Sequence, residues 1–255
     1  MNIVAIIPAR YGSTRLPAKA LVDLCGKPMI QRVVEQAKQS RLLNRVIVAT
    51  DDERIAAAVR SINGDVVMTP ASIRTGSDRI AAAVASVPEA DIIINVQGDE
   101  PLIAPQMIDE AIAPLIDDDL VQVATVVKRI KTADELKNPN TVKAVLDASG
   151  DAVYFSRSPI PYLRDNVPIE KWHARHTYYK HFGLYVFRRA FLLEFSSWPE
   201  ATLEKIEKLE QLRIIEHGYR IRAVVTEHDS IPVDTPEDAE LVRSIIKHHE
   251  TAGLK

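Results

Sequence analysis

Short apolar runs alternate with helical patterns through the first half of the chain, and this alternation restricts the fold more than any other feature. Four runs predict strands, at 3–7, 45–49, 65–68 and 91–96, and the first is expected to be buried on both faces. Apolar positions at helical spacing predict helices over 28–40, 55–62, 77–87 and 105–116. Strands joined by helices in this way form right-handed βαβ units, so an α/β fold with a largely parallel sheet is predicted.

The second half of the chain follows a less regular pattern. Strands are expected at 121–128, 142–146, 152–156, 178–187 and 221–225. A continuous helix is predicted over 203–217 with Gly218 as its stop, and 157–176 is expected to be a loop. Asp234 opens the signature of a last helix. No Gly/Ser linker divides the chain, so the second half should fold onto the first or insert a subdomain into it.

Composition excludes several classes of protein. The chain has 255 residues, and 32 Lys and Arg against 35 Asp and Glu give a formal charge of −3, which excludes a basic protein that coats nucleic acid. Cys25 is the single cysteine, so no intrachain disulfide forms, as is typical of a reducing compartment. No apolar run reaches the ~18 residues of a membrane helix, and the N-terminus lacks the features of a secretory signal. We therefore expect a cytoplasmic protein that binds neither nucleic acid nor membrane.

The loop after the first predicted strand, residues 8–19, is the richest in chemistry. Ligands of parallel α/β sheets bind beyond the carboxyl ends of the strands. This loop carries Arg10, Arg15, Lys19, one glycine and two hydroxyl residues. Basic side chains and exposed backbone N–H groups bind anions, and triphosphate is the natural ligand, although the glycine spacing is that of neither a Walker loop nor a GxGxxG turn. The alternative is an ordinary charged surface loop.

Residues 97–101, Gln-Gly-Asp-Glu-Pro, follow the fourth predicted strand. A carboxylate at this strand end can hold a divalent cation through oxygen ligands, and Gly98 would let another group approach the backbone closely. The alternative is a turn in which Asp99 caps the next helix. Residues 75–79 predict a helix N-terminus capped by Ser77, whose N–H groups could also serve a base or a phosphate.

The histidines give a weaker signal. None has metal-ligand spacing beside a cysteine pair, so a zinc site is excluded. His181 lies among tyrosines in a predicted strand, where a single histidine is more often a packed or surface residue than a catalyst. The charged residues 204–210 are expected to form a solvated helix face.

Nine motifs, in order and at compatible spacing, resemble the 3-deoxy-manno-octulosonate cytidylyltransferase (CMP-Kdo synthetase) family. They are IIPARYGSTRLPAK at 6–19, GKPMI at 26–30, VATDD at 48–52, NVQGDEP at 95–101, NPNTVKAVLD at 138–147, YFSRSPIP at 154–161, KHFGLY at 180–185, LEKIEKLEQLR at 203–213 and VDTPEDAE at 233–240. The resemblance implies a single Rossmann-like nucleotidyltransferase domain over 1–255, with a central largely parallel sheet. A smaller sheet subdomain, over about 140–220, would bind the sugar and form a homodimer.

The resemblance also implies the reaction and its residues. CTP and Mg²⁺ would activate the acid sugar Kdo for lipopolysaccharide synthesis, giving CMP-Kdo and pyrophosphate. The implied catalytic residues are Arg10, Lys19 and Asp99. The implied nucleotide-binding residues are Ala9, Arg10, Ser13, Lys19, Arg74, Ser77 and Arg79. The implied sugar-binding residues are Arg15, Gln97, His181, Tyr185, Glu210 and Gln211. The implied Mg²⁺ ligands are Asp99 and Asp234.

The sequence departs from the family pattern at a few positions. Ala18 and Ala20 replace the glycine and second proline of the usual LPGKPL, and alanine suits position 18 if its φ is negative. Residues 75–79 exchange the hydroxyl residues of the usual SGT(D/E)R, and Arg74 replaces another polar residue. The 8-amino analogue of Kdo and sialic acid therefore remain alternative substrates. A protein that binds the nucleotide without turnover is the non-enzymatic alternative.

Overall fold

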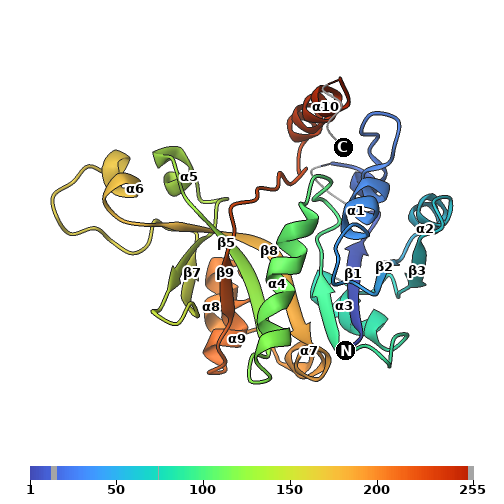
Figure 1. Ribbon diagram of the computed structural model, residues 1–255, viewed down its shortest axis with the longest axis horizontal. Coiled ribbons are helices and arrows are strands. Elements are labelled where there is room, and N and C mark those ends of the chain that lie inside the picture. The colour runs from blue at the N-terminus through green and yellow to red at the C-terminus, as the bar shows by residue number, and fades with distance from the viewer. Residues whose placement is uncertain (13–15, 74, 252–255) are drawn as a thin grey trace. The chain divides into compact units, whose positions relative to one another are not determined.

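The computed structural model describes residues 1–12, 16–73 and 75–251 (Figure 1). The chain divides into two compact units. Met1–Asp109 and the C-terminal stretch from Asp229 form the first unit, and Glu110–His228 forms the second. The subdomain predicted over about 140–220 falls within the second unit, and the single-domain organisation stays a prediction. In the part of the chain that the structure describes, no helix combines the length and apolar character needed to cross a bilayer.

The first unit contains the four predicted parallel strands. They are β1 (Ile3–Ala9), β2 (Arg45–Thr50), β3 (Asp65–Met68) and β4 (Ile92–Asn95), in the order β3-β2-β1-β4. β1 pairs in parallel with both β2 and β4, and β2 pairs in parallel with β3. Consecutive residues of β1 and β4 are buried, as expected of strands covered on both faces.

Helices connect these strands as the periodicity predicts. They are α1 (Met29–Ala37), α2 (Glu53–Arg60) and α3 (Gly76–Val84), and α4 (Pro105–Asp117) begins in this unit and continues into the next. A 3-10 turn, η1 (Lys19–Leu21), was not predicted. Two caps differ from expectation: Thr75 rather than Ser77 caps α3, and Pro28 occupies the N-cap position of α1 rather than its first turn.

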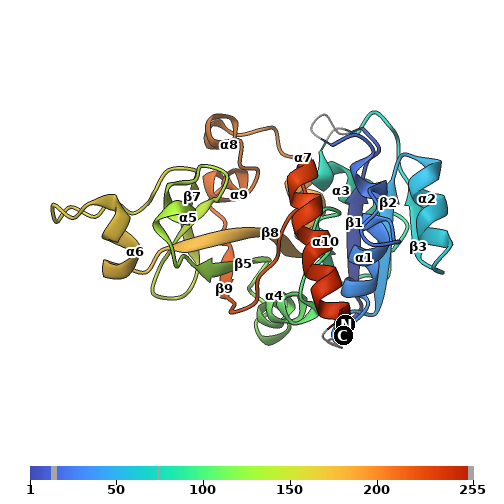
Figure 2. The ribbon, with the colours of Figure 1, turned by 90° about the horizontal axis from the view of Figure 1, so that it is seen from above.

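The last helix, α10 (Pro236–Thr251), lies beside α1 (Figure 2). Val233, Val242 and Ile246 pack in one apolar cluster with Leu24 and Met29. This packing holds the segment before α10 against the loop that follows β1. Residues more than 200 positions apart are therefore brought to the same edge of the sheet.

The second unit contains a mixed sheet. Its strands are β5 (Val123–Arg129), β6 (Lys143–Leu146), β7 (Ala152–Ser156), β8 (Tyr179–Arg188) and β9 (Arg222–Val225). β5 pairs antiparallel with β8 and parallel with β9, while β6 pairs antiparallel with β7 and β8. The β5–β8 register shifts between Thr125 and Val126, which face Tyr185 and Phe182.

The predicted continuous helix over 203–217 is wrong. The segment forms α8 (Thr202–Glu207) and α9 (Leu212–Glu216), and Lys208 between them adopts a left-handed conformation with φ of 54°. The Arg157 guanidinium donates to the carbonyl groups of Glu207 and Lys208, at 2.8 and 3.3 Å. The last carbonyl groups of α8 are thus satisfied by the Arg157 side chain and not by N–H groups of a further helical turn. Apolar periodicity in the sequence cannot reveal such a contact with a distant residue.

Helical pieces also occur where none were predicted. The expected loop 157–176 contains η2 (Ile169–Lys171) and α6 (Trp172–Arg175). Trp172 is buried in a cluster with Tyr178, Ile130 and Leu136, and this packing supports a helix of four residues. The helices α5 (Ala133–Lys137) and α7 (Arg189–Ser197) are further additions.

Candidate functional site

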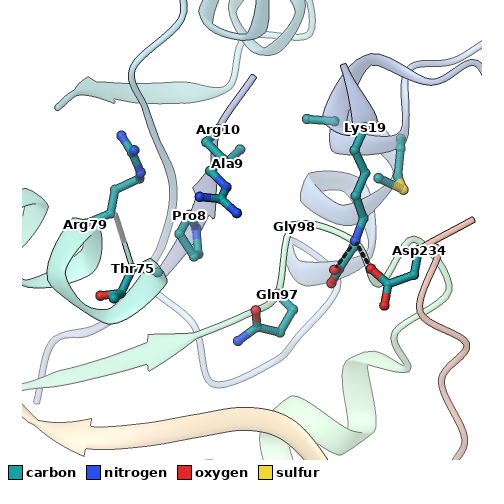
Figure 3. A pocket seen from close by; sticks show the side chains of 13 residues that line it. Pro8, Ala9, Arg10, Lys19, Thr75, Arg79, Gln97, Gly98 and Asp234 are labelled. Carbon is teal, nitrogen blue, oxygen red and sulfur yellow. Dashed lines mark hydrogen bonds and ion pairs between the residues drawn. The ribbon is translucent and has the colours of Figure 1, made fainter. Parts of the chain in front are cut away.

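A pocket of about 310 Å³ opens at the carboxyl ends of β1 and β4 in the first unit (Figure 3). Its lining comes from the loops after those strands, from η1, and from the starts of α1, α3 and α10. The lining residues are Pro8, Ala9, Arg10, Lys19, Ala20, Met29, Thr75, Gly76, Arg79, Gln97, Gly98, Asp99 and Asp234. The position agrees with the rule that ligands bind beyond the strand ends of a parallel sheet.

Lys19 and Asp234 meet at one end of this pocket (Figure 3), and Asp99 joins them there. The Lys19 ammonium nitrogen lies 2.5 Å from Asp99 Oδ2 and 2.7 Å from Asp234 Oδ1. Burial alone lowers the pKa of Lys19, but the charges and hydrogen bonds of the two carboxylates outweigh it, so the pKa is raised. The lysine is therefore a permanent cation held between two carboxylates that come from distant parts of the sequence.

The backbone fixes both carboxylates. Val233 N–H donates to the Asp99 carbonyl at 2.9 Å, which joins the loop after β4 to the segment before α10. The Asp238 carboxylate accepts from the N–H groups of Asp234 and Thr235, at 3.0 and 2.9 Å, and the Thr235 hydroxyl caps α10 by accepting from the Asp238 N–H at 3.2 Å. The position of Asp234 thus follows from the helix-start signature in the sequence.

The two carboxylates fit a Mg²⁺ ion whose remaining ligands are phosphate oxygens and water. Within the described ranges, no group of three or more His, Cys, Asp or Glu side chains could hold a metal by itself. Mg²⁺ commonly takes only one or two protein carboxylates and completes its shell with water and substrate phosphates. Asp99 and Asp234 already converge on a single cation, the Lys19 ammonium group.

Gly98 allows a close backbone contact, as expected. A Cβ atom at this position would lie 2.8 Å from the Pro8 carbonyl oxygen, so no other residue fits without a shift of the loop. Gln97 beside it lines the same pocket, and its amide donates to Asn95 Oδ1 at 3.3 Å. Gln97, assigned to the sugar by resemblance, therefore lies in one cavity with the nucleotide candidates Ala9 and Arg10.

The other end of the pocket is formed by the start of α3. Thr75 and Gly76 line it, and Ser77 is buried in the first turn. Arg79 is only 2% exposed, and its guanidinium donates to the Thr69 hydroxyl, to Asp51 at 2.8 Å and to the Ile73 carbonyl at 3.1 Å. Arg79 thus ties together the segments that shape this wall. The predicted site residues Ser13, Arg15 and Arg74 lie outside the described residues.

The backbone immediately before Lys19 is strained. Ala18 has φ of 51° and ψ of 34°, which is the left-handed conformation. The condition under which alanine suits this position, a negative φ, is therefore not met. Non-glycine residues in this region cost of order 1 kcal/mol or more.

The remaining sugar candidates gather in the second unit. His181 and Tyr185 lie on β8, with ring centroids 5.3 Å apart, and Glu210 and Gln211 lie between α8 and α9. Burial, and then the negative charge of Glu210, raise the pKa of Tyr185, so its phenol stays protonated. Among the described residues, the buried Gln211 Nε2 has no hydrogen-bond partner, and the buried Tyr185 hydroxyl has only a poorly formed one, with Thr125. Such groups call for a ligand or an ordered water.

Thr125 is a neighbour of this group that sequence reasoning missed. It is fully buried on β5, and its Oγ1 lies 2.9 Å from His181 Nε2. A threonine inside the apolar run VATVV gives no signal in the sequence, because β-branched residues are common in strands.

Comparison with known proteins identifies the family. The chain matches the cytidylyltransferase family over residues 4–221. A 3-deoxy-manno-octulosonate cytidylyltransferase from Geobacter sulfurreducens is 54% identical over 97% of this chain and 100% of its own. The chain belongs to the 3-deoxy-manno-octulosonate cytidylyltransferase family. A further member, from Solibacter usitatus, is 49% identical over 99% of this chain and 98% of its own.

Solved structures agree with the family and the fold. The structure of CMP:2-keto-3-deoxy-manno-octonic acid synthetase complexed with CTP matches with a TM-score of 0.91 and 43% identity, over 98% of this chain and 100% of that chain. The 4-diphosphocytidyl-2C-methyl-D-erythritol synthase of Anaerococcus prevotii, with a TM-score of 0.61 and 14% identity over 96% and 98%, shares the fold alone. The predicted Rossmann-like nucleotidyltransferase fold is confirmed.

Proposed function

We propose that this protein transfers the cytidylyl group of CTP to Kdo, giving CMP-Kdo and pyrophosphate for lipopolysaccharide synthesis. The observation that carries the proposal is the Lys19 ammonium between Asp99 and Asp234, in the strand-end pocket of a chain from this family. A pocket that combines a cation, two carboxylates and Arg10 suits a nucleoside triphosphate with its metal ion.

The reaction is an in-line displacement. The anomeric hydroxyl oxygen of Kdo attacks the α-phosphorus of CTP, the bond from that phosphorus to the pyrophosphate oxygen breaks, and the hydroxyl proton is lost. Positioning and charge neutralisation, rather than a nucleophilic side chain, lower the barrier of such a reaction. Lys19 and Arg10 neutralise the phosphates in this scheme. Asp99 and Asp234 hold Mg²⁺, which when bound lowers the pKa of the attacking hydroxyl and stabilises the leaving group.

The two units supply different recognition elements. In the first unit, the backbone at Ala9 and the wall fixed by Arg79 frame the cytosine. In the second unit, His181, Tyr185, Glu210 and Gln211 offer hydrogen bonds to the sugar acid. The buried Tyr185 hydroxyl and Gln211 amide support this role, since the sugar hydroxyls would supply the partners that both groups need.

Pyrophosphate release tests the proposal. The purified protein is mixed with CTP and Mg²⁺, and Kdo, its 8-amino analogue and sialic acid are supplied in parallel reactions. Release with Kdo that stops on addition of EDTA is the expected result. Release only with the 8-amino sugar, or only with sialic acid, would keep the reaction type and change the substrate. Bound CTP without any release would instead favour the non-catalytic alternative.

The homodimer and the cytoplasmic location belong to the same proposal. A sedimentation experiment at micromolar protein checks the assembly, with a mass of two chains as the expected result. A single-chain mass under these conditions would contradict the dimer without touching the assignment of the reaction.

A further inference from the structure

The β5–β8 pairing contains an irregularity centred on Thr125. Thr125 faces Tyr185 and Val126 faces Phe182, so β8 carries two extra residues, Gly183 and Leu184, at this point. The carbonyl groups of Phe182 and Leu184 turn toward Thr125, and their oxygens lie 3.4 and 2.8 Å from its Oγ1. Bulges of this kind reorient side chains next to functional sites.

The hydrogen-bond geometry fixes which atom donates to which. A threonine hydroxyl has a single proton, and a carbonyl oxygen can only accept. The 2.8 Å contact between Thr125 Oγ1 and the Leu184 carbonyl oxygen therefore places the hydroxyl proton on that line. With its proton directed at the carbonyl groups, Thr125 Oγ1 is left to accept at its contact with His181 Nε2, at 2.9 Å. His181 consequently carries its proton on Nε2 and a lone pair on Nδ1.

The surroundings of the His181 ring keep the imidazole neutral. Phe155 and Tyr185 flank it, with ring centroids at 4.9 and 5.3 Å, and burial lowers the pKa of His181 to about 3, so the imidazole is neutral near pH 7. No residue in the described part of the chain makes a hydrogen bond to Nδ1. His181 as a residue is only partly buried, and Nδ1 is the ring nitrogen that the described residues leave for a ligand.

We propose that Thr125 is a positioning residue that holds His181 with a bare Nδ1, as the acceptor for a hydroxyl group of the acid sugar. The inference rests on the proposed function, because it assumes that the acid sugar binds at His181. A hydroxyl donates only one proton, so an acceptor at a fixed position selects the orientation of that hydroxyl. Without Thr125 Oγ1, either ring nitrogen can hold the proton and the ring loses its anchor.

The tautomer can be measured without substrate. Long-range ¹H–¹⁵N correlation spectra of protein labelled with ¹⁵N-histidine distinguish the two nitrogens, and a His181→Gln sample assigns the signal. We expect the Nε2–H form of His181 in the wild type and in Thr125→Ser, and a mixture of tautomers in Thr125→Val. Thr226→Val, which alters an equally buried threonine of the second unit, should leave the signal unchanged. The Nδ1–H form in the wild type would overturn the proposal.

Steady-state kinetics provide the second readout. Loss of one well-placed hydrogen bond is expected to raise the KM for Kdo about tenfold in Thr125→Val. The KM for CTP should stay within about twofold, since CTP binds in the first unit, and Thr125→Ser should recover most of the loss. A purely structural threonine would instead lower the active fraction and leave both KM values unchanged, and that result would overturn the proposal.

The two readouts separate this inference from the proposed function. If the wild type releases pyrophosphate with Kdo but Thr125→Val keeps its tautomer and its KM, only the role of Thr125 is wrong. If the wild type fails to use Kdo, the assignment of the sugar as the ligand of His181 is wrong. The tautomer spectra then still show whether Thr125 fixes the position of the proton on the ring. Should Thr125→Val not fold, Thr125→Ala removes the same hydroxyl with less crowding beside the bulge and is measured in its place.

Discussion

Two lysines, the partly buried Lys19 of the first unit and the fully buried Lys143 of the second, show how differently the two halves of the molecule use charge. Lys19 lies between two carboxylates, which raise its pKa against the opposing effect of burial. Lys143 is fully buried and donates only to the carbonyl groups of Asn138 and Thr141, at 2.9 and 2.7 Å. Burial, and then the charge of Arg157, lower the pKa of Lys143 to about 8. The partners of a buried lysine, more than its depth, decide whether it stays a strong cation.

The same contrast separates the two candidate sites. The pocket of the first unit is built from ionised groups that already pair with one another, as Lys19 does with Asp99. The group around His181 in the second unit contains a neutral imidazole, a protonated phenol and an unpartnered amide, together with the charged Glu210. A preorganised set of charges suits phosphates and a metal ion, whereas buried neutral donors and acceptors suit the hydroxyl groups of a sugar.

Substitution of Asp99 is the strongest test of the view that the charged pocket serves the metal ion and the phosphates. Asp99→Asn removes one of two cation ligands, and turnover should fall at least about a hundredfold because the charge of the transition state loses its counterion. Pyrophosphate release at saturating CTP and Kdo measures the loss, and circular dichroism checks the fold. Asp65→Asn, on a solvent-exposed aspartate of the same unit, is the matched control and should keep normal turnover. An active Asp99→Asn enzyme would contradict the metal role.

Lys19 should compete with a metal ion for the carboxylates as long as no nucleotide is bound. In Lys19→Met, we expect turnover to fall about a hundredfold, because a phosphate loses its cation. We also expect the nucleotide-free variant to bind Mn²⁺ at least about tenfold more tightly than the wild type, since an ammonium no longer lies between Asp99 and Asp234. Mn²⁺ titration followed by electron paramagnetic resonance measures the affinity. Equal affinities in the two proteins, with Lys27→Met as the surface control, would argue against this competition.

Lys143 makes the stability of the protein depend on pH in a defined direction. Its folded pKa of about 8 lies below the ordinary value of 10.5, so between these values the unfolded chain binds more protons. The free energy of unfolding should therefore gain up to about 3 kcal/mol from this group as the pH rises from 8 to 10.5. Urea denaturation across this range, wild type against Lys143→Met, isolates the gain. The exposed Lys171→Met should follow the wild type, and a difference that is independent of pH would refute the assignment.

Tyr185 tests whether the neutral site serves a ligand or the fold. Tyr185→Phe removes a buried hydroxyl whose contact with Thr125 is poorly formed, so stability should change by less than about 1 kcal/mol. The KM for Kdo should rise about fivefold to tenfold, because the sugar loses a hydrogen bond. Tyr178→Phe is the matched control, since the Tyr178 hydroxyl donates to the Pro161 carbonyl at 2.9 Å and is structural. It should lose about 1 kcal/mol of stability and keep its KM, and the same pattern in Tyr185→Phe would exclude a role in binding.

The sequence predicted the first unit well because local pattern and tertiary structure agree there. The central strands β1 and β4 are nearly continuous apolar runs, and the loops at the strand ends, with Lys19 and Asp99, follow from the topology of parallel strands. Asp234 is more than 130 residues from Asp99, and the resemblance to the family, rather than spacing, joined the two. The Asp51–Arg79 pair went unpredicted, because Asp51 looks like a second cap for α2.

The second unit was predicted less well because tertiary contacts override its local pattern. The periodicity of 203–217 continues through Lys208, but Arg157 takes the carbonyl groups that end α8. A buried ion pair between Glu204 and Arg213 then joins the two helices at 2.6 Å. The contact between Thr125 and His181 depends on two extra residues in β8, and a shift of register leaves no trace in a strand of aromatic and β-branched residues.

The smallest expected effect concerns Ala18, the strained residue immediately before Lys19. It tests whether the backbone pays a cost in stability to hold this charge in place. Its left-handed φ of 51° costs alanine about 1–2 kcal/mol, whereas glycine adopts this conformation freely but loses more entropy on folding. Ala18→Gly should therefore raise the free energy of unfolding by roughly 0.5–1 kcal/mol. Ala20→Gly, two residues later inside η1, has no positive φ to relieve and should lower it by a similar amount. Urea denaturation of both variants measures the two shifts. Equal losses of stability would show that the backbone at position 18 carries no strain, and the reason for glycine there in related sequences would then have to lie in the bound state.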